Sequence, residues 1–172
     1  VERHETLRTT FAWRDGQAVQ LIHEPTVAFE QIDLRDLAPD LQAAEAHQLA
    51  LAEAQIPFDL QVGPLLRVTL LQLGQQQMTQ QQTCDEHLLL VTLHHIITDG
   101  WSNGIFVQEL TALYSAFQRN QPSPLPPLPI QYADFAQWQR NWLAGAEMAR
   151  QLAYWQQQLA DAPPLLSLPT DR

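Results

Sequence analysis

The sequence predicts an α/β (α+β) fold in which helices cover a β-sheet, and three stretches indicate it. The run His87–Leu93 is apolar, rich in branched residues and of strand length, as expected of a buried strand. Residues 101–120 carry apolar side chains at helical spacing. Residues 9–22 read as two short strands around a turn. The length of 172 residues suits one compact unit.

The first half of the chain predicts a hairpin, a helix and two strands. Arg14-Asp15-Gly16 is a good turn sequence between TTFAW and QAVQLI, so Thr9–Ile22 is expected to form a hairpin. Asp40–Ala54 is expected to be a helix closed by Pro57. Leu65–Leu73 is expected to be a strand paired with the run at 87–93. Between these strands, residues 74–86 hold two Gln triplets and predict a solvated polar loop.

The second half predicts three helices. Trp101–Asn120 is expected to be a helix with Ser102 as its N-cap and with a buried apolar stripe. Residues 121–129 are rich in proline and predict an extended connector. Tyr132–Leu143 and Ala146–Leu159 are expected to be helices. Their aromatic side chains fit amphipathic packing better than a ligand cage: Tyr132, Phe135, Trp138, Trp142, Tyr154 and Trp155.

Composition excludes several classes of function. The net charge of −10 argues against a nucleic-acid partner and against binding to an anionic membrane surface. The single cysteine, Cys84, cannot form an intramolecular disulfide, which fits a reducing compartment. No run reaches the roughly 18 apolar residues that a membrane span needs, and no signal peptide is visible. We therefore expect a cytoplasmic protein.

Two adjacent histidines, His94 and His95, follow the strand that ends at Leu93. Consecutive side chains of an extended chain point to opposite faces, so only one of the two can face a cleft. An imidazole titrates near neutral pH and can serve there as a base. Asp99 and Gly100 follow at a turn, where an anchoring role suits the aspartate better than a proton-carrying one. Metal binding is disfavoured because no companion cluster of ligands accompanies the pair.

Five segments in order resemble motifs of the condensation domains of non-ribosomal peptide synthetases. They are RHExLRT at Arg3–Thr9, PFDL with GPLLR at Pro57–Arg67, HHxxxDG at His94–Gly100, YxDFAxW at Tyr132–Trp138, and LPTDR at Leu168–Arg172. HxxxDG alone occurs in other acyltransferases, whereas five ordered matches over the whole chain are specific. The resemblance implies a mixed β-sheet covered by helices, like one lobe of chloramphenicol acetyltransferase.

The resemblance also implies an activity. Such a domain forms an amide bond between an acyl or peptidyl donor and an aminoacyl acceptor, each carried as a thioester on the phosphopantetheine arm of a carrier domain. No cofactor is bound directly. The implied partners are the donor and acceptor peptidyl carrier domains, the C-terminal lobe and an adjacent adenylation domain. Because a first motif is missing upstream of Val1 and second-lobe motifs are missing after Arg172, we expect residues 1–172 to be most of the N-terminal lobe, inactive when isolated.

The family's roles carry over onto individual residues. His95 is implied to orient the acceptor amine or to take its proton, and Gly100 to leave room for substrate and offer its N–H to the oxyanion. The resemblance makes His94 and Asp99 structural, with Asp99 paired to Arg3 or Arg8. Trp101 belongs to a DGWS ending that is similar to that of members joining L-configured donors. Two alternatives stay open: a coenzyme A-dependent O- or N-acyltransferase, and a non-catalytic, scaffold-type relative.

Overall fold

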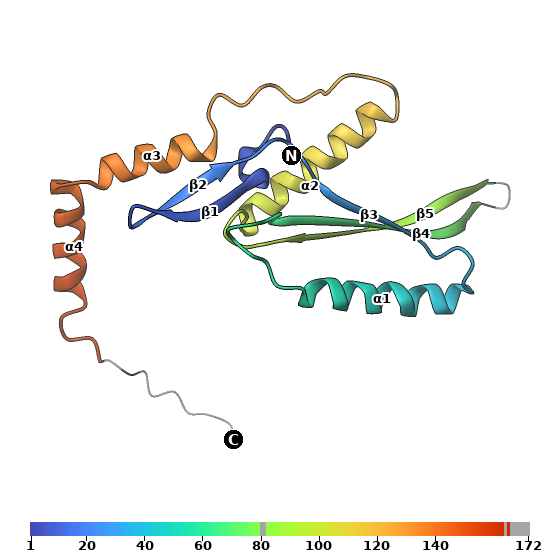
Figure 1. Cartoon of the computed structure of the whole chain (residues 1–172), viewed down its shortest axis with the longest axis horizontal. Coiled ribbons are helices and arrows are strands. Elements are labelled where there is room, and N and C mark those ends of the chain that lie inside the picture. The colour runs from blue at the N-terminus through green and yellow to red at the C-terminus, as the bar shows by residue number, and fades with distance from the viewer. Residues whose placement is uncertain (80–81, 164, 166–172) are drawn as a thin grey trace. The chain divides into compact units, whose positions relative to one another are not determined.

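The computed structural model describes residues 1–79, 82–163 and 165. The chain divides into two compact units, Val1–Gln131 and Tyr132–Arg172, and each is described by itself (Figure 1). The LPTDR segment at Leu168–Arg172 lies outside the described residues. Within the described ranges, no helix combines the length and the apolar character that a bilayer crossing requires.

The first unit begins with a hairpin, as predicted. A short 3-10 helix, η1 (Glu5–Arg8), leads into β1 (Thr9–Arg14), which pairs antiparallel with β2 (Gln17–Ile22). The two turn residues, Asp15 and Gly16, both have positive φ, 51° and 74°. That backbone matches the right-handed twist of the strands and favours Asp-Gly at these two positions.

A three-stranded mixed sheet forms the centre of the first unit. Its order is β3 (Ala28–Asp33), β4 (Leu66–Thr79), β5 (Gln82–Leu93), with β3 parallel and β5 antiparallel to β4. The predicted α/β class with a mixed sheet is therefore confirmed. β3 was not expected from the sequence, because an edge strand reading AFEQID, with only Ile32 partly buried, carries no apolar run.

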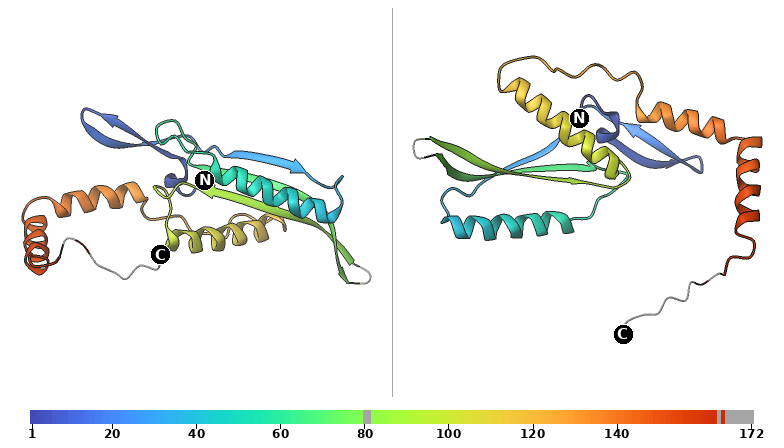
Figure 2. Two further views of the ribbon diagram at one scale, coloured as in Figure 1. Left: turned by 90° about the horizontal axis from the view of Figure 1, so that it is seen from below. Right: turned by 180° about the vertical axis from the view of Figure 1, so that it is seen from behind.

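Alternation along β4 creates two small apolar clusters, one on each face of the sheet. Leu71 packs with Leu34 and Ala46, and the latter comes from α1 (Pro39–Gln55), which runs beside the sheet (Figure 2). Leu66 belongs to the other cluster, with Leu65 and Ile97. Leu71 is fully buried and Leu66 is 3% exposed. The second cluster thus fixes the sheet at the carboxyl end of β5, where Leu66 lies opposite Leu93, and the first fixes it near the middle of β5, where Leu71 lies opposite Leu88.

The polar loop predicted for residues 74–86 is wrong. β4 extends into it as far as Thr79 and β5 begins at Gln82, with Gly74 opposite Glu86 and Gln76 opposite Cys84, so the two strands pair as expected but over a longer stretch. Glutamine has weak strand propensity, but backbone pairing with a neighbouring strand overrides propensity in an exposed ladder. Register shifts at Gln72/Gly74 and Gln77/Thr79 mark where the pairing is irregular.

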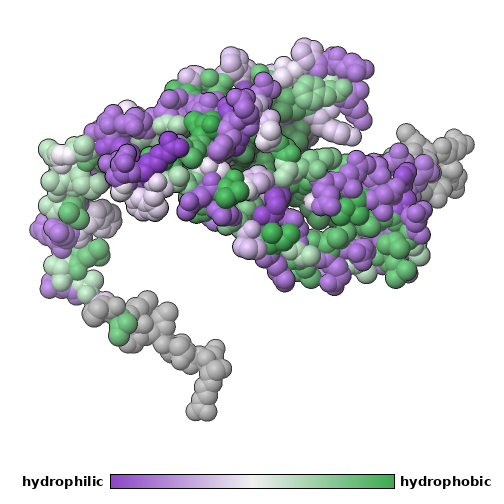
Figure 3. All heavy atoms as spheres, in the orientation of Figure 1, coloured by the Kyte–Doolittle hydropathy of each residue, from purple (hydrophilic) through white to green (hydrophobic). Residues whose placement is uncertain are grey.

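The helix predicted at 101–120 is α2 (Gly100–Phe117), but its apolar stripe is not core. Only Ala116 is buried, while Ile105, Leu110 and Tyr114 are 42%, 39% and 66% exposed. The space-filling view likewise shows apolar side chains lying among polar ones on the visible surface (Figure 3). The stripe has a helical period, yet within the described residues of this unit little packs against it.

The second unit consists of α3 (Tyr132–Leu143) and α4 (Ala146–Gln158), close to the predicted bounds. An aromatic row follows one side of α3: Phe135 lies 5.6 Å from Trp138 between ring centroids, and Trp138 stacks on Trp142 at 5.6 Å with an interplanar angle of 3°. The expected burial of these side chains is not seen, since Trp138 and Trp142 are 56% and 49% exposed.

Candidate active site

The two histidines of the motif have different surroundings. The backbone N–H of His94 donates to the Leu65 carbonyl at 3.0 Å, which continues the β4–β5 pairing by one residue. The His94 ring is half-buried, packs edge-on against Phe58 at 5.7 Å, and its Nδ1 accepts the Ile96 N–H at 3.0 Å. His95 is exposed. The expected division, with one ring packed and the other free, is what the structure has.

A tight turn then leads from β5 into α2. The Ile97 N–H donates to the His94 carbonyl at 3.0 Å, and the Ile97 side chain is 6% exposed within the cluster around Leu65. A buried side chain in the middle of the turn fixes its path relative to the sheet. The backbone that carries His95 is therefore held in place, an arrangement that would suit a catalytic base.

Asp99 caps α2. Its Oδ1 accepts the Ser102 N–H at 2.8 Å and the Ser102 hydroxyl at 2.6 Å. These two hydrogen bonds, from the hydroxyl and then from the backbone, hold the pKa of Asp99 below its ordinary value. The predicted N-cap, Ser102, is thus wrong by three residues: Ser102 is the donor and Asp99 the cap.

The expected ion pair of Asp99 with Arg3 or Arg8 is also wrong. Arg3 Nε donates to Glu109 Oε1 at 3.0 Å, and Arg8 contacts Glu5 Oε1 at 3.5 Å and the His23 carbonyl. Since Asp99 already accepts two hydrogen bonds at a solvent-exposed helix end, it needs no cation to be satisfied. The structural role predicted for Asp99 is present, but through capping.

Gly100 is the first residue of α2, so its N–H has no acceptor within the helix. A Cβ built on Gly100 would meet no atom within 4 Å, so the space beside this backbone is open. Trp101 follows with 83% of its surface exposed. The N-terminal end of a helix also carries partial positive charge, which favours a developing oxyanion nearby.

The PFDL and GPLLR stretches lie against the first histidine. Phe58 contacts the His94 ring, and the Arg67 guanidinium lies 3.8 Å from the centre of the same Phe58 ring. Arg67 Nε also donates to Glu53 Oε1 at 2.6 Å, which ties β4 to α1. The chain of contacts from Glu53 through Arg67 and Phe58 to His94 explains why these motifs accompany one another.

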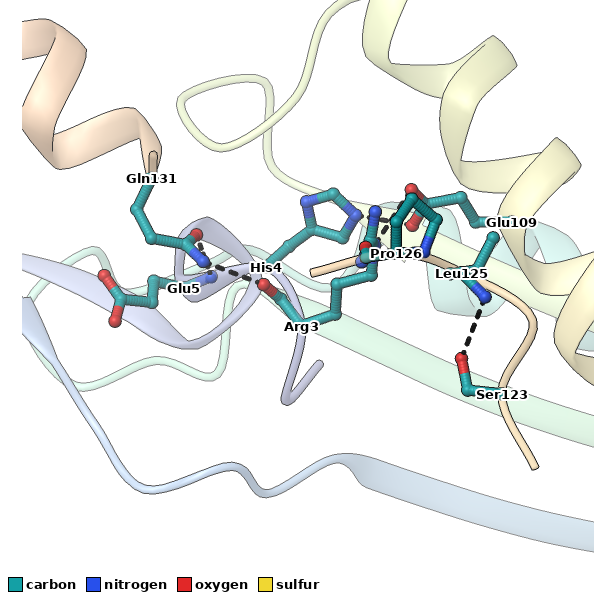
Figure 4. Close-up of polar contacts among 8 residues, drawn as sticks. All are labelled: Arg3, His4, Glu5, Glu109, Ser123, Leu125, Pro126 and Gln131. Atoms are coloured by element: carbon teal, nitrogen blue, oxygen red, sulfur yellow. Dashed lines mark hydrogen bonds and ion pairs between the residues drawn. The ribbon is translucent and has the colours of Figure 1, made fainter. Parts of the chain in front are cut away.

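Sequence reasoning missed Glu109. This carboxylate accepts from Arg3 Nε and from His4 Nε2, the latter at 2.6 Å, and its side chain is 16% exposed (Figure 4). A usable signal was present, because Glu109 is the single charged residue between Gly100 and Phe117. A lone charge in an otherwise apolar and neutral helix indicates a specific partner.

A half-open cavity of about 460 Å³ lies elsewhere in the first unit, lined among others by Arg8, Thr10, His23 and Val62, and His95 is not among its lining residues. Among the described residues, no group of three or more His, Cys, Asp or Glu side chains is placed to hold a metal ion.

Comparison with known proteins gives the family. The Condensation domain model matches residues 1–172. One of the linear gramicidin synthase proteins of Brevibacillus parabrevis is 51% identical over 173 residues, covering 100% of this chain and 3% of the relative. Malpinin synthetase of Mortierella alpina is 44% identical over 170 residues, covering 98% of the chain and 2% of the relative.

Solved structures of related domains also resemble this chain. The epimerization domain from the third module of tyrocidine synthetase B is 28% identical, with a TM-score of 0.73 over 98% of this chain and 36% of that one. The starter condensation domain of rhizomide synthetase, at 23% identity and a TM-score of 0.77, covers 93% of this chain and 36% of that one, and it supports the fold. Because the family model spans every residue, the chain belongs to the condensation domain family.

Proposed function

We propose that this chain is part of a condensation domain that joins an acyl or peptidyl donor to an aminoacyl acceptor, both carried as thioesters on phosphopantetheine arms. The observation that carries the proposal is the exposed His95 in the turn after β5, followed five residues later by Gly100 at the start of α2, where the space beside the backbone is open. Acyl transfer to an amine needs a base and an N–H donor, and these two residues supply one each.

In this proposal the acceptor amine attacks the thioester carbonyl carbon of the donor. The C–N bond forms, the carbonyl oxygen becomes an oxyanion, and the C–S bond then breaks to release the donor arm as a thiol. His95 orients the amine or takes its proton and returns a proton to the departing sulfur. The Gly100 N–H donates to the oxyanion, which helps because this N–H is already in place as charge develops.

The remaining motif residues hold the backbone around His95 and Gly100 in place. His94 holds the end of β5 through its packing on Phe58 and its contact with Ile96. Asp99 fixes the first turn of α2, and with it the position of Gly100. The packed His94 and the exposed His95 fit the roles that the motif implies, which are structural for the first histidine and chemical for the second.

The whole activity needs more than these residues. The chain spans 3% of the length of the gramicidin synthase relative and 36% of the solved domains. We propose that a second lobe, donor and acceptor carrier domains and an adjacent adenylation domain complete the machinery. No cofactor other than the carriers' phosphopantetheine is proposed.

The test is amide formation by the intact synthetase that contains this chain, with one carrier loaded with donor and the next with an aminoacyl group. The expected product is a condensed, amide-linked thioester on the acceptor carrier, detected by mass spectrometry of the carrier. Transfer from an acyl-coenzyme A to a free amine or alcohol, with none to the loaded carrier, would instead identify a coenzyme A-dependent acyltransferase. Loaded carriers that stay unreacted would indicate a non-catalytic relative.

A further inference from the structure

The position of α2 depends on few apolar contacts. Among its 18 residues only Ala116 is buried, whereas Ile105, Val107 and Leu110 are 42%, 61% and 39% exposed. Burial of apolar area is normally what fixes a helix on its domain. Phe106 and Leu113 are half-buried, so apolar contacts fix α2 only in part, and its connection to the turn at its N-terminus and polar contacts along its length add to them.

One charged cluster supplies those polar contacts. The Glu109 carboxylate accepts from Arg3 Nε at 3.0 Å with one oxygen and from His4 Nε2 at 2.6 Å with the other (Figure 4). The side chains of Glu109, Arg3 and His4 are 16%, 21% and 31% exposed, so water competes only partly for these bonds. Hydrogen bonds between charged groups are about twice as strong as neutral ones.

Arg3 and its neighbours also form hydrogen bonds with the segment that follows α2. A second guanidinium nitrogen of Arg3 donates to the Pro126 carbonyl. Gln131 Nε2 donates to the Arg3 carbonyl at 3.0 Å, and its Oε1 accepts the Glu5 N–H at 3.2 Å. Hydrogen bonds thus join the segment Arg3–Glu5 to the connector that follows α2. Glu109 in turn joins α2 to that segment.

We propose that Glu109 is a positioning residue for the condensation centre, which sets the tilt of α2 and so the place of the Gly100 N–H. The inference rests on the proposed function. Glu109 lies nine residues after Gly100, about 14 Å along the helix at about 1.5 Å per residue. Over that length, a tilt of about 5° about the anchor moves the first turn by about 1 Å, and such a displacement can cost about 10²-fold in rate.

The first experiment is single-turnover transfer between loaded carriers in the intact synthetase, with Glu109→Ala, Glu109→Gln and the matched control Gln108→Ala, an exposed neighbour on the same helix. Glu109→Ala should lower the rate constant by about 10- to 10²-fold. Glu109→Gln keeps the shape and one accepting oxygen, so it can retain one of the two accepted hydrogen bonds and should recover part of that loss. Gln108→Ala should match the wild type.

The readout separates positioning from folding. A variant that merely folds poorly loses amplitude while the rate constant of its active fraction stays the same. A misplaced Gly100 lowers the rate constant at full amplitude. If Glu109→Ala and Glu109→Gln kept the wild-type rate constant, the proposal would be overturned.

A second experiment needs no activity and tests the anchor alone. Amide hydrogen exchange across residues 99–106 should be faster in Glu109→Gln than in the wild type and in Gln108→Ala, because the first turns of α2 lose their fixed orientation. Unchanged exchange there would overturn the positioning role. An inactive wild type would refute the proposed function instead, so the two failures are distinguishable.

Discussion

At the scale of single residues, His94 and His95 have different surroundings because the turn after β5 points their side chains in different directions. The ring of His94 lies edge-on to Phe58 and accepts the Ile96 N–H on its Nδ1, so its neutral form carries the proton on Nε2. His95, one residue on, is exposed. A packed ring cannot reach substrate, and a free ring contributes little to stability.

Asp99 is where residue-scale chemistry gives a prediction. Since Ser102 holds the pKa of Asp99 below 3.8 in the folded chain, its stabilising contribution is complete above that pH and is lost as pH falls through the folded value. Asp99→Asn keeps an acceptor at the cap, so it should melt close to the wild type at neutral pH and lose less stability on acidification. Asp99→Ala should melt lower at neutral pH.

Thermal unfolding of the three proteins at neutral pH and at a pH below 3.8 measures this. The other carboxylates titrate equally in all three, so only the differences count. Equal acid-induced losses in the wild type and Asp99→Asn would refute capping by the ionised carboxylate.

Much of the site could be predicted at this scale, and its limits are physical. Alternation along an extended chain predicts that His94 and His95 point apart, although in the structure β5 ends at Leu93 and the turn after it is what gives them different surroundings. The partner of Asp99 could not be found this way, because an aspartate before a helix serves equally as a cap or as half of an ion pair. Of the two cations that sequence reasoning offered it, Arg3 contacts Glu109, more than 100 residues away in the chain, and Arg8 contacts Glu5.

At the scale of elements, the sheet is held by the odd-numbered side of β4 against α1 and by the even-numbered side against the turn. Leu71 packs with Leu34 and Ala46 on the first side, and Leu66 packs with Ile97 on the second. Because Leu66 lies opposite Leu93, the second cluster fixes the end of β5, while the first, around Leu71 opposite Leu88, fixes the strand five residues earlier. This fixing is what the exposed histidine beyond it depends on.

Leu71→Ala should therefore destabilise the first unit by about 2–5 kcal/mol, because it leaves a cavity where the side chain is fully buried. The matched control is Leu88→Ala. Leu88 lies directly opposite on β5 and is 40% exposed, so its truncation should cost clearly less. Urea unfolding of both variants gives the comparison, and equal losses would contradict the assignment of Leu71 to the buried core.

Helices and the hairpin were predictable as elements, whereas the glutamine-rich ladder and the edge strand β3 were not. The turn at Asp15-Gly16 and the period of α3 are local signals, readable from a few neighbouring residues. Pairing of Gln76 with Cys84, or of Phe29 with Val68, is decided by backbone hydrogen bonds to another strand. No local pattern carries that information.

At the scale of the whole chain, large apolar side chains remain at the surface of both units. Tyr114 and Phe117 on α2 are 66% and 56% exposed, and Tyr132 on α3 is 57% exposed. The helical period correctly marked α2 and α3 as helices, but burial depends on what a face meets, which a period does not specify. The chain covers 36% of the related solved domains, so the remaining parts of such a domain would supply contacts absent here.

The isolated 172-residue chain should therefore associate with itself and form no amide product. Exposed apolar area favours association, and under the proposed function a second lobe completes the centre. Sedimentation velocity over a range of concentrations measures the first expectation, and turnover with two loaded carriers measures the second. Amide formation by the isolated chain at a measurable rate would show that these residues alone suffice.

In the proposed function His95 carries the chemistry, and His94 holds the backbone after β5 in place. Single-turnover transfer between loaded carriers in the intact synthetase tests it most directly, with His95→Ala and His94→Ala compared at equal folded concentration. The account predicts that His95→Ala slows transfer by about 10²–10⁴-fold with an unchanged melting temperature. It predicts that His94→Ala lowers the melting temperature and leaves the rate constant of the folded fraction near that of the wild type. A near-normal rate for His95→Ala, or a well-folded His94→Ala that transfers nothing, would contradict it.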